Sequence, residues 1–290
     1  MFFIFAFTYN QNMKKFLLLL CFILGSTMLY SQQKEKIKGS KIVTITQKEI
    51  GEFETLEVQD NLEIFLIKGE QSAVEIEADD NLHDAVLIEL KANTLRLSAS
   101  KQVSGAKKFS VRVTYTDNLK MVIAKNDANI TALAEVNLTD FTFKSFDSAK
   151  FYGNVNAKKF TLMANDKSKT ELNLKSEETI IELSKSAQLK ALIATVKMKF
   201  DMYQKTTAII EGDVIDLKLR LDNNSVFTGK NLTSKNAEIT TEGYTNCSLL
   251  VNTKAVIDAS GKSEIQLYGD QKIEMKRFVE NASLSKKTLK

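Results

Sequence analysis

From residue 141 onward, the pattern of apolar and polar positions repeats about every nineteen residues. Copies of the pattern begin at residues 141, 160, 179, 198, 217, 237 and 255, and a less regular copy begins near Leu119. In each copy the first, third and fifth residues are mostly apolar or small, and the fourth is mostly charged, as in 217–221 (LKLRL). This alternation with a period of two predicts a β-strand that has one buried face and one exposed face.

Each copy also predicts a tight bend followed by a second strand. Five of the seven residues at the seventh position of the copies are Asp, Asn or Gly, which tolerate a left-handed backbone. These seven residues are Asp147, Asp166, Lys185, Gln204, Asn223, Gly243 and Gly261. In the second strand, one shared position is occupied by Phe151, Leu189, Phe227, Cys247 and Ile265. Each copy is therefore expected to consist of a strand, a bend and a second strand.

Two short strands cannot bury their apolar face alone, so the copies must stack on one another. Stacking in register pairs each strand with its equivalents in the neighbouring copies and buries a continuous core. A propeller blade would need four strands in roughly forty residues, and a left-handed hexapeptide helix would show a period of six. The sequence therefore predicts an all-β fold, with a parallel β-helix over residues 119–273 that rises about 4.8 Å per coil. Such solenoids are generally right-handed, and we expect the same hand here.

The segments outside these copies follow a different pattern. Residues 41–118 contain many alternating stretches but no nineteen-residue period, which predicts a β-rich cap or larger first coils. Within them, residues 82–90 (LHDAVLIEL) are compatible with a helical turn or a strand. Residues 32–40 are expected to be a linker, and residues 274–290 a C-terminal cap with a basic tail.

Residues 1–31 have the features of a secretory signal peptide. A short basic stretch at 13–15 (MKK) precedes an apolar core at 16–24, and small residues follow before Ser31. The apolar core is too short to span a bilayer, which favours cleavage near Ser31 over a membrane anchor. Residues 1–12 are expected to lie upstream of the true start at Met13. The mature chain is thus predicted to be exported to the periplasm or the cell surface.

Charge and cysteine content limit the classes of partner. The chain has 40 basic and 36 acidic residues, and loss of Lys14 and Lys15 with the signal peptide would leave 38 basic residues. A nearly neutral mature chain argues against a nucleic-acid partner, which selects a strong basic excess. Cys21 would also be removed, so Cys247 would have no partner for an intramolecular disulfide.

Few residues qualify for catalysis or for binding a metal or cofactor. His83 is the only histidine, and Cys247 lies at a core position of the repeat, where a thiol is inert. No metal site and no cofactor are expected.

Polysaccharide lyases and hydrolases are the enzymatic alternative, because parallel β-helices often carry these activities. Their sites need clustered carboxylates. Asp147 and Asp166 would stack at the bend, and Glu182 and Asp201 would stack at one strand position. Both pairs are isolated and are followed by basic residues, which indicates charge balance on an exposed face. We therefore expect a protein that is not an enzyme.

Three aromatic residues lie at or next to the bend, where a ring could stack on a sugar. They are Phe146, Tyr203 and Tyr244, and they are the candidate binding residues of the sequence.

Two segments resemble a known family. Residues 53–82 (FETLEVQDNLEIFLIKGEQSAVEIEADDNL) and 259–270 (ASGKSEIQLYGD) are similar to the auto-transporter adhesin, head GIN domain family of Bacteroidetes. Most copies have Asp, Asn, Lys or Gln where that family has a glycine-rich turn. The resemblance implies a right-handed β-helix at the cell envelope, with an adhesin-like or structural role and a surface glycan or envelope protein as partner. It carries over no catalytic or binding residue.

Overall fold

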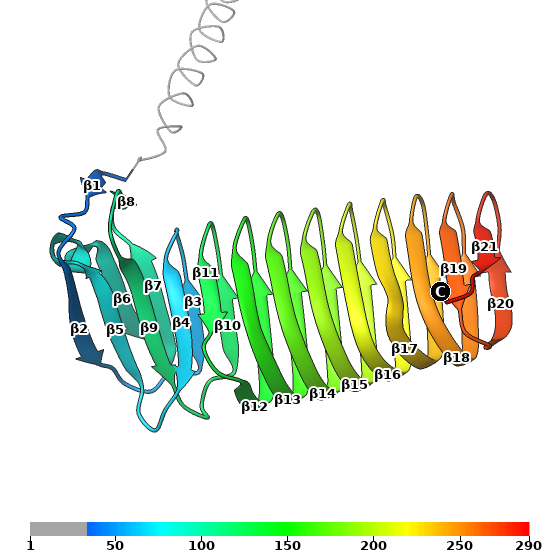
Figure 1. The fold of residues 1–290 in the computed structure, drawn as a ribbon, viewed down its shortest axis with the longest axis horizontal. Helices are drawn as coiled ribbons and strands as arrows, with labels where there is room; N and C mark the ends of the chain where they lie inside the picture. The colour runs from blue at the N-terminus through cyan, green and yellow to red at the C-terminus, as the bar shows by residue number, and fades with distance from the viewer. Residues whose placement is uncertain (1–33, 290) are drawn as a thin grey trace, which may run out of the picture. The chain divides into compact units, whose positions relative to one another are not determined.

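The computed structural model describes residues 34–289, which form a stack of parallel strands (Figure 1). The predicted β-solenoid is confirmed, with about nine coils spaced about 19 residues apart. The predicted signal region 1–31 lies outside the described residues.

The coils are built from long strands rather than pairs of short ones. Each strand from β13 to β18 carries the second strand of one copy and continues without a break into the first strand of the next copy, so only the bend interrupts the ladder. The strands are β12 (Val136–Ser145), β13 (Lys150–Ala164), β14 (Lys169–Leu183), β15 (Gln188–Met202), β16 (Thr207–Leu221), β17 (Val226–Thr241), β18 (Asn246–Ala259), β19 (Glu264–Tyr268), β20 (Lys272–Phe278) and β21 (Ser283–Lys286). All pair parallel with their neighbours in the stack. Phe160, for example, lies between Phe141 of the preceding coil and Thr179 of the following coil.

Core residues at equivalent positions form ladders along the stack. The shared position of the second strand is occupied by Phe151, Thr170, Leu189, Ala208, Phe227, Cys247 and Ile265, and each of these is at most 2% exposed. Large and small side chains alternate along much of this ladder, so that each ring can pack over a smaller neighbour. Rings also meet across the interior: the Phe143 and Phe151 centroids are 4.4 Å apart.

The bend has a left-handed backbone at every predicted position. The φ angles are 58° at Asp147, 59° at Asp166, 61° at Lys185, 56° at Gln204, 50° at Asn223, 72° at Gly243 and 74° at Gly261. The backbone N–H groups of neighbouring bends join the coils, as in the 2.8 Å hydrogen bond from Ser186 N to Asp166 O. The bend is therefore the structural cause of the Asp, Asn and Gly preference.

The first coils do not follow the order of the chain. The coil made by β3 (Thr55–Val58) and β4 (Glu63–Lys68) lies between two later ones: the coil of β7 (Thr94–Ala99) and β9 (Phe109–Tyr115), and the coil of β10 (Met121–Ala124) and β11 (Asn129–Ala132). Residues 41–118 thus supply two parallel coils as well as a cap.

The cap is antiparallel, unlike the rest of the ladder. It consists of β2 (Val43–Glu49), β5 (Ala73–Asp79) and β6 (Val86–Lys91), and a 3-10 helix at Asp80–Ala85 joins the last two. Residues 82–90 therefore contain both a helical turn and a strand. Two short parallel strands, β1 (Lys36–Lys38) and β8 (Gln102–Ser104), pair beside the cap, so residues 36–38 of the expected linker are a strand.

A buried carboxylate holds the cap together. Asp79 is 0% exposed and accepts hydrogen bonds from the backbone N–H groups of Lys41 (2.8 Å), Lys107 (3.0 Å) and Lys108 (3.0 Å). Gly39 packs so closely on this carboxylate that a Cβ there would collide with it. Burial alone would raise the pKa of Asp79, but the hydrogen bonds outweigh it and hold the pKa below the ordinary value of 3.8.

The buried core ladder predicts that substitutions on the inward face of a strand lower the free energy of unfolding much more than substitutions on its outward face. Leu219 is 1% exposed, so Leu219→Ala is expected to lower the free energy of unfolding by about 2–5 kcal/mol. Leu219→Asp is expected to lower it by more, because it buries an unpaired charge. Lys169→Asp, at an exposed position, is the control and is expected to stay within about 0.5 kcal/mol of wild type. Urea denaturation measures all three, and equal midpoints for Leu219→Asp and Lys169→Asp would contradict the burial of Leu219.

The lowered pKa of Asp79 makes the stability of the cap depend on pH. Its contribution is fully present above the ordinary pKa and is lost as the pH falls through the lowered pKa of the folded state. The difference in urea midpoint between wild type and Asp79→Asn should therefore be largest at neutral pH and shrink in acid. A difference that stays constant from neutral pH to strong acid would show that the ionised carboxylate contributes nothing.

Candidate functional site

The three aromatic residues predicted as binding candidates do not form one site. Phe146 and Tyr203 occupy the same position of the bend but lie three coils apart, with Asn165 and Ser184 between them. Both rings are half-buried. Tyr244 is 59% exposed and lies on the other side of the bend, after the left-handed residue. The structure therefore offers no continuous aromatic platform there.

Two of these rings already contact cations. The guanidinium carbon of Arg220 lies 5.8 Å from the centroid of Tyr203, and Lys262 Nζ lies 5.2 Å from the centroid of Tyr244. Burial and the nearby Asp201 raise the pKa of the Tyr203 phenol. A sugar that stacked on either ring would have to share it with the cation.

The stacked carboxylates at the bend join neighbouring coils. Asp147 Oδ2 accepts a 2.9 Å hydrogen bond from the backbone N–H of Asn126, and Asp166 Oδ2 accepts one of 3.4 Å from Asp147 N. Lys185 Nζ lies 2.6 Å from Asp166 Oδ1, and this hydrogen bond lowers the pKa of Asp166. These contacts give both carboxylates a structural role.

The second acidic pair is held in a similar way. Glu182 and Asp201 are in register on β14 and β15, and Lys199 Nζ lies 2.9 Å from Asp201 Oδ2. The ammonium group of Lys199 thus offsets the repulsion between the two carboxylates.

The remaining candidates for chemistry lie apart from one another. His83 Nε2 is 2.8 Å from Thr44 Oγ1 in the cap. Cys247 is buried in the core, and burial raises the pKa of its thiol to about 12. Within residues 34–289, no group of three His, Cys, Asp or Glu side chains could hold a metal ion.

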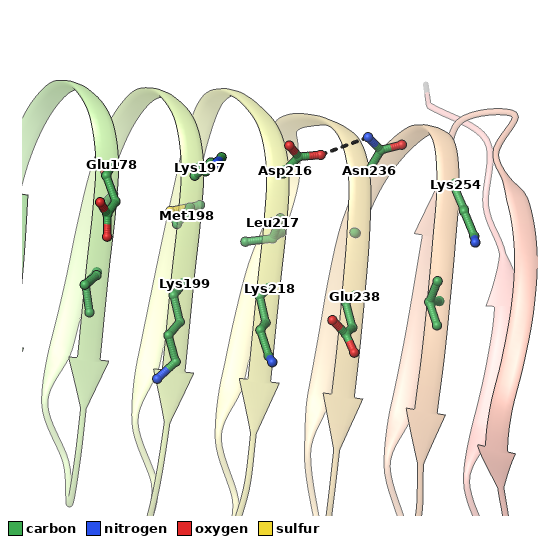
Figure 2. Close-up of a pocket in the computed structure, with 14 residues that line it drawn as sticks. Glu178, Lys197, Met198, Lys199, Asp216, Leu217, Lys218, Asn236, Glu238 and Lys254 are labelled. Carbon is green, nitrogen blue, oxygen red and sulfur yellow. Dashed lines mark hydrogen bonds between the residues drawn. The ribbon is translucent and has the colours of Figure 1, made fainter. Parts of the chain in front are cut away.

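A groove that sequence reasoning missed crosses the outer face of β14–β18. Its volume is about 440 Å³, and it lies over one buried core ladder, Thr179, Met198, Leu217 and Ala237. The partly exposed apolar side chains in its lining are Ile180 on β14 and Val256 on β18. Figure 2 shows Met198 and Leu217 on adjacent strands, with lysine side chains lying along the strands next to them. The groove runs along the solenoid axis, so each coil contributes equivalent residues to it.

Four lysines line the groove: Lys197, Lys199, Lys218 and Lys254. Lys199 and Lys218 are in register on neighbouring strands, which places two like charges side by side. Lys199 is hydrogen-bonded to Asp201, which raises the pKa of its ammonium group, and Lys254 Nζ is 2.7 Å from Glu274. Among the described residues, Lys197 and Lys218 make no ion pair.

The three carboxylates of the groove have partners at its edges. Glu178 is 3.2 Å from Lys159 Nζ, Glu238 is 3.0 Å from Lys276 Nζ, and Asp216 accepts a 2.9 Å hydrogen bond from Asn236 (Figure 2). Groups outside the groove neutralise two of its lysines and two of its carboxylates, so Lys197 and Lys218 against Asp216 leave an excess of one positive charge. Ammonium groups between the partly exposed side chains of Ile180 and Val256 suit a ligand that has both anionic and apolar parts.

The sequence held a signal for this groove at the second residue of each copy, which faces outward. Lys199 and Lys218 are nineteen residues apart and therefore fall side by side once the coils are in register. The hollow itself leaves no periodic signal in the sequence.

None of the helices in the described residues is both long and apolar enough to cross a membrane.

Three solved structures with the same fold come from species of Parabacteroides. A "putative adhesin" from Parabacteroides distasonis has a TM-score of 0.64 and 16% identity, covering 87% of this chain and 100% of its own. A "putative adhesin" from Parabacteroides merdae has a TM-score of 0.59 and 18% identity, covering 87% and 99%. A "putative lipid binding protein" from P. distasonis has a TM-score of 0.57 and 13% identity, again covering 87% and 99%. At these identities the likeness shows the fold alone.

A family model matches most of the chain. The search of curated proteins found no match to the chain. The model described as "Putative auto-transporter adhesin, head GIN domain" matches residues 52–173 and again residues 167–270, in agreement with the resemblance of the two sequence segments. Membership in a family of adhesins supports an adhesin-like binding role. The chain belongs to the auto-transporter adhesin, head GIN domain family.

Proposed function

We propose that this chain is an exported, non-catalytic, adhesin-like module of the cell envelope that binds an anionic partner in the groove on β14–β18. The observation that carries the proposal is the in-register pair Lys199 and Lys218 in the groove. Two like charges side by side destabilise a sheet, and an anionic ligand bound between them would remove that cost.

The form of the groove suits an extended partner. It crosses five strands, so at about 4.8 Å per coil it offers a contact on the order of 20 Å long. An acidic polysaccharide or an acidic segment of an envelope protein would meet equivalent side chains at each coil.

The carboxylates support a passive role. Asp147 and Asp166 bind backbone N–H groups of neighbouring coils, and Glu178 and Glu238 bind lysines outside the groove. Acid–base catalysis needs a carboxyl group free to exchange a proton with the substrate.

A polysaccharide lyase or hydrolase working in the same groove is the alternative. The observation in its favour is Lys218, which lies beside carboxylates and makes no ion pair among the described residues. A lysine side chain without a fixed ionic partner is free to turn toward a bound substrate, as a catalytic base must.

The lysine pair predicts which polymer is retained. The mature chain should bind immobilised alginate, an acidic polysaccharide, more strongly than dextran, and the retention should fall as salt shortens the Debye length from about 10 Å at 0.1 M to about 3 Å at 1 M. The double variant Lys199→Gln, Lys218→Gln should bind alginate roughly tenfold more weakly, since each exposed charge contact contributes about 0.2–1 kcal/mol.

A matched control exists on the neighbouring strands β13 and β14. Lys150 and Lys169 are also exposed and in register, but they lie outside the groove, so the double variant Lys150→Gln, Lys169→Gln should retain alginate binding. Equal losses in the two double variants would show that charge alone, and not the groove, is responsible. Sustained release of unsaturated or reducing ends in proportion to the amount of protein would establish the enzymatic alternative.

Export is tested by fractionation of cells that express the full sequence. The product should start near Gln32 and be recovered from the periplasm or the envelope, because the basic and apolar stretches before Ser31 are those of a cleavable signal. N-terminal sequencing identifies the processing site. Recovery of the intact precursor from the cytoplasm would contradict the proposal.

A further inference from the structure

We propose that a second site, on a different face of the coils, binds a neutral oligosaccharide along the solenoid axis over Tyr152, Asn154 and Asn173. This site is separate from the lysine groove, because it lies on the first part of the long strands, whereas the lysine groove lies on their last part. Nothing in the proposed function requires it.

Two adjoining hollows mark the site. One, of about 580 Å³, lies over the outer side of β13–β16 and is lined by Tyr152, Glu171 and Lys190 among others. The other, of about 390 Å³, shares Asn154 and Asn173 with it. The two amides therefore form a ridge between the hollows, where a ligand can reach them from either side.

The two asparagines form an amide ladder. Asn154 and Asn173 are in register, both are exposed, and Asn173 Nδ2 donates a 2.7 Å hydrogen bond to Asn154 Oδ1. This bond orients both amides and leaves the Asn154 amino group and the Asn173 oxygen without a partner among the described residues. An aligned donor and acceptor of this kind match the neighbouring hydroxyl groups of a pyranose ring.

Tyr152 supplies the apolar part of sugar recognition. It precedes Asn154 by two residues on β13, so both side chains face outward on the same side of the strand. The ring is half-buried, which restricts its motion, and among the described residues no cation lies over it, in contrast to Tyr203 and Tyr244. An aromatic ring beside oriented amides can stack on the C–H face of a sugar while the amides bind its hydroxyl groups.

The repeat of the coils also fits a sugar chain. Successive coils are about 4.8 Å apart, which is close to the length of one pyranose residue in an extended chain. A chain along the axis would therefore place successive residues over Tyr152 and Asn154 of one coil and Glu171 and Asn173 of the next.

Charge favours a neutral chain over an acidic one. Glu171 and Glu211 line the first hollow, and Lys190 is the one basic residue in its lining. Asn231 donates a 3.2 Å hydrogen bond to Glu211 but brings no positive charge. This balance is the reverse of that in the lysine groove, so an anionic polymer is repelled here.

Titration calorimetry of the mature chain with cello-, manno- and xylo-oligosaccharides tests the site. At least one series should bind, and Tyr152→Ala and Asn173→Ala should each weaken binding roughly tenfold, as expected for loss of a contact of about 1.4 kcal/mol. Tyr152→Phe keeps the ring and should stay within about twofold of wild type. Thermal unfolding of each variant shows whether it is folded, and Asn173→Ala, at an exposed position, keeps the test valid if Tyr152→Ala does not fold.

Controls separate this site from the other surfaces. Tyr203→Ala removes a ring at the bend, and Asn246→Ala removes an exposed amide elsewhere, so both should bind as wild type does. The Lys199→Gln, Lys218→Gln double variant should lose alginate binding and keep oligosaccharide binding. Failure of all three series to bind, or binding unaffected by both Tyr152→Ala and Asn173→Ala, overturns the proposal without bearing on the lysine groove.

Discussion

The left-handed bend between strands is the constraint on which the rest of the structure depends. A coil can pair in register with the next one only if both reverse direction at the same point and with the same geometry. The positive φ angles from Asp147 to Gly261 meet that condition. For residues other than glycine a left-handed backbone costs roughly 1–2 kcal/mol, and the hydrogen bonds between bends help to offset it. Asp147 and Asp166 contribute by binding the backbone of the preceding bend with their side chains.

Much of the repeat could be predicted from the sequence because its causes are local. Alternation places Leu217, Leu219 and Leu221 inside, and a residue that tolerates positive φ must follow two positions later at Asn223. The order of the first coils could not be predicted in this way. The coil that starts at Thr55 lies between the coil that starts at Thr94 and the coil that starts at Met121, and this arrangement depends on long-range pairing, which leaves no periodic signal.

The binding surfaces were harder to predict than the fold for a related reason. The aromatic residues at the bend were chosen by residue type, but Arg220 and Lys262 lie against two of the rings. The lysine groove instead depends on which outward-facing side chains fall next to each other in register. The nineteen-residue period already predicted that Lys199 and Lys218 lie side by side, but the groove around them became known only with the structure.

A solenoid separates the requirements of folding from those of recognition. Inward-facing ladders must fill the interior, so Phe200, Leu219 and Ile239 replace one another as apolar residues of different size. Outward-facing ladders have no such requirement beyond charge balance, and the same strand can carry Lys190 at one end and Lys199 at the other in different surroundings. The two outer faces of one stack can therefore acquire opposite charge preferences without any change in the core. In a family that shares the fold at low identity, the outward ladders are thus the positions at which ligand preference can diverge while the left-handed bend and the buried ladders stay the same.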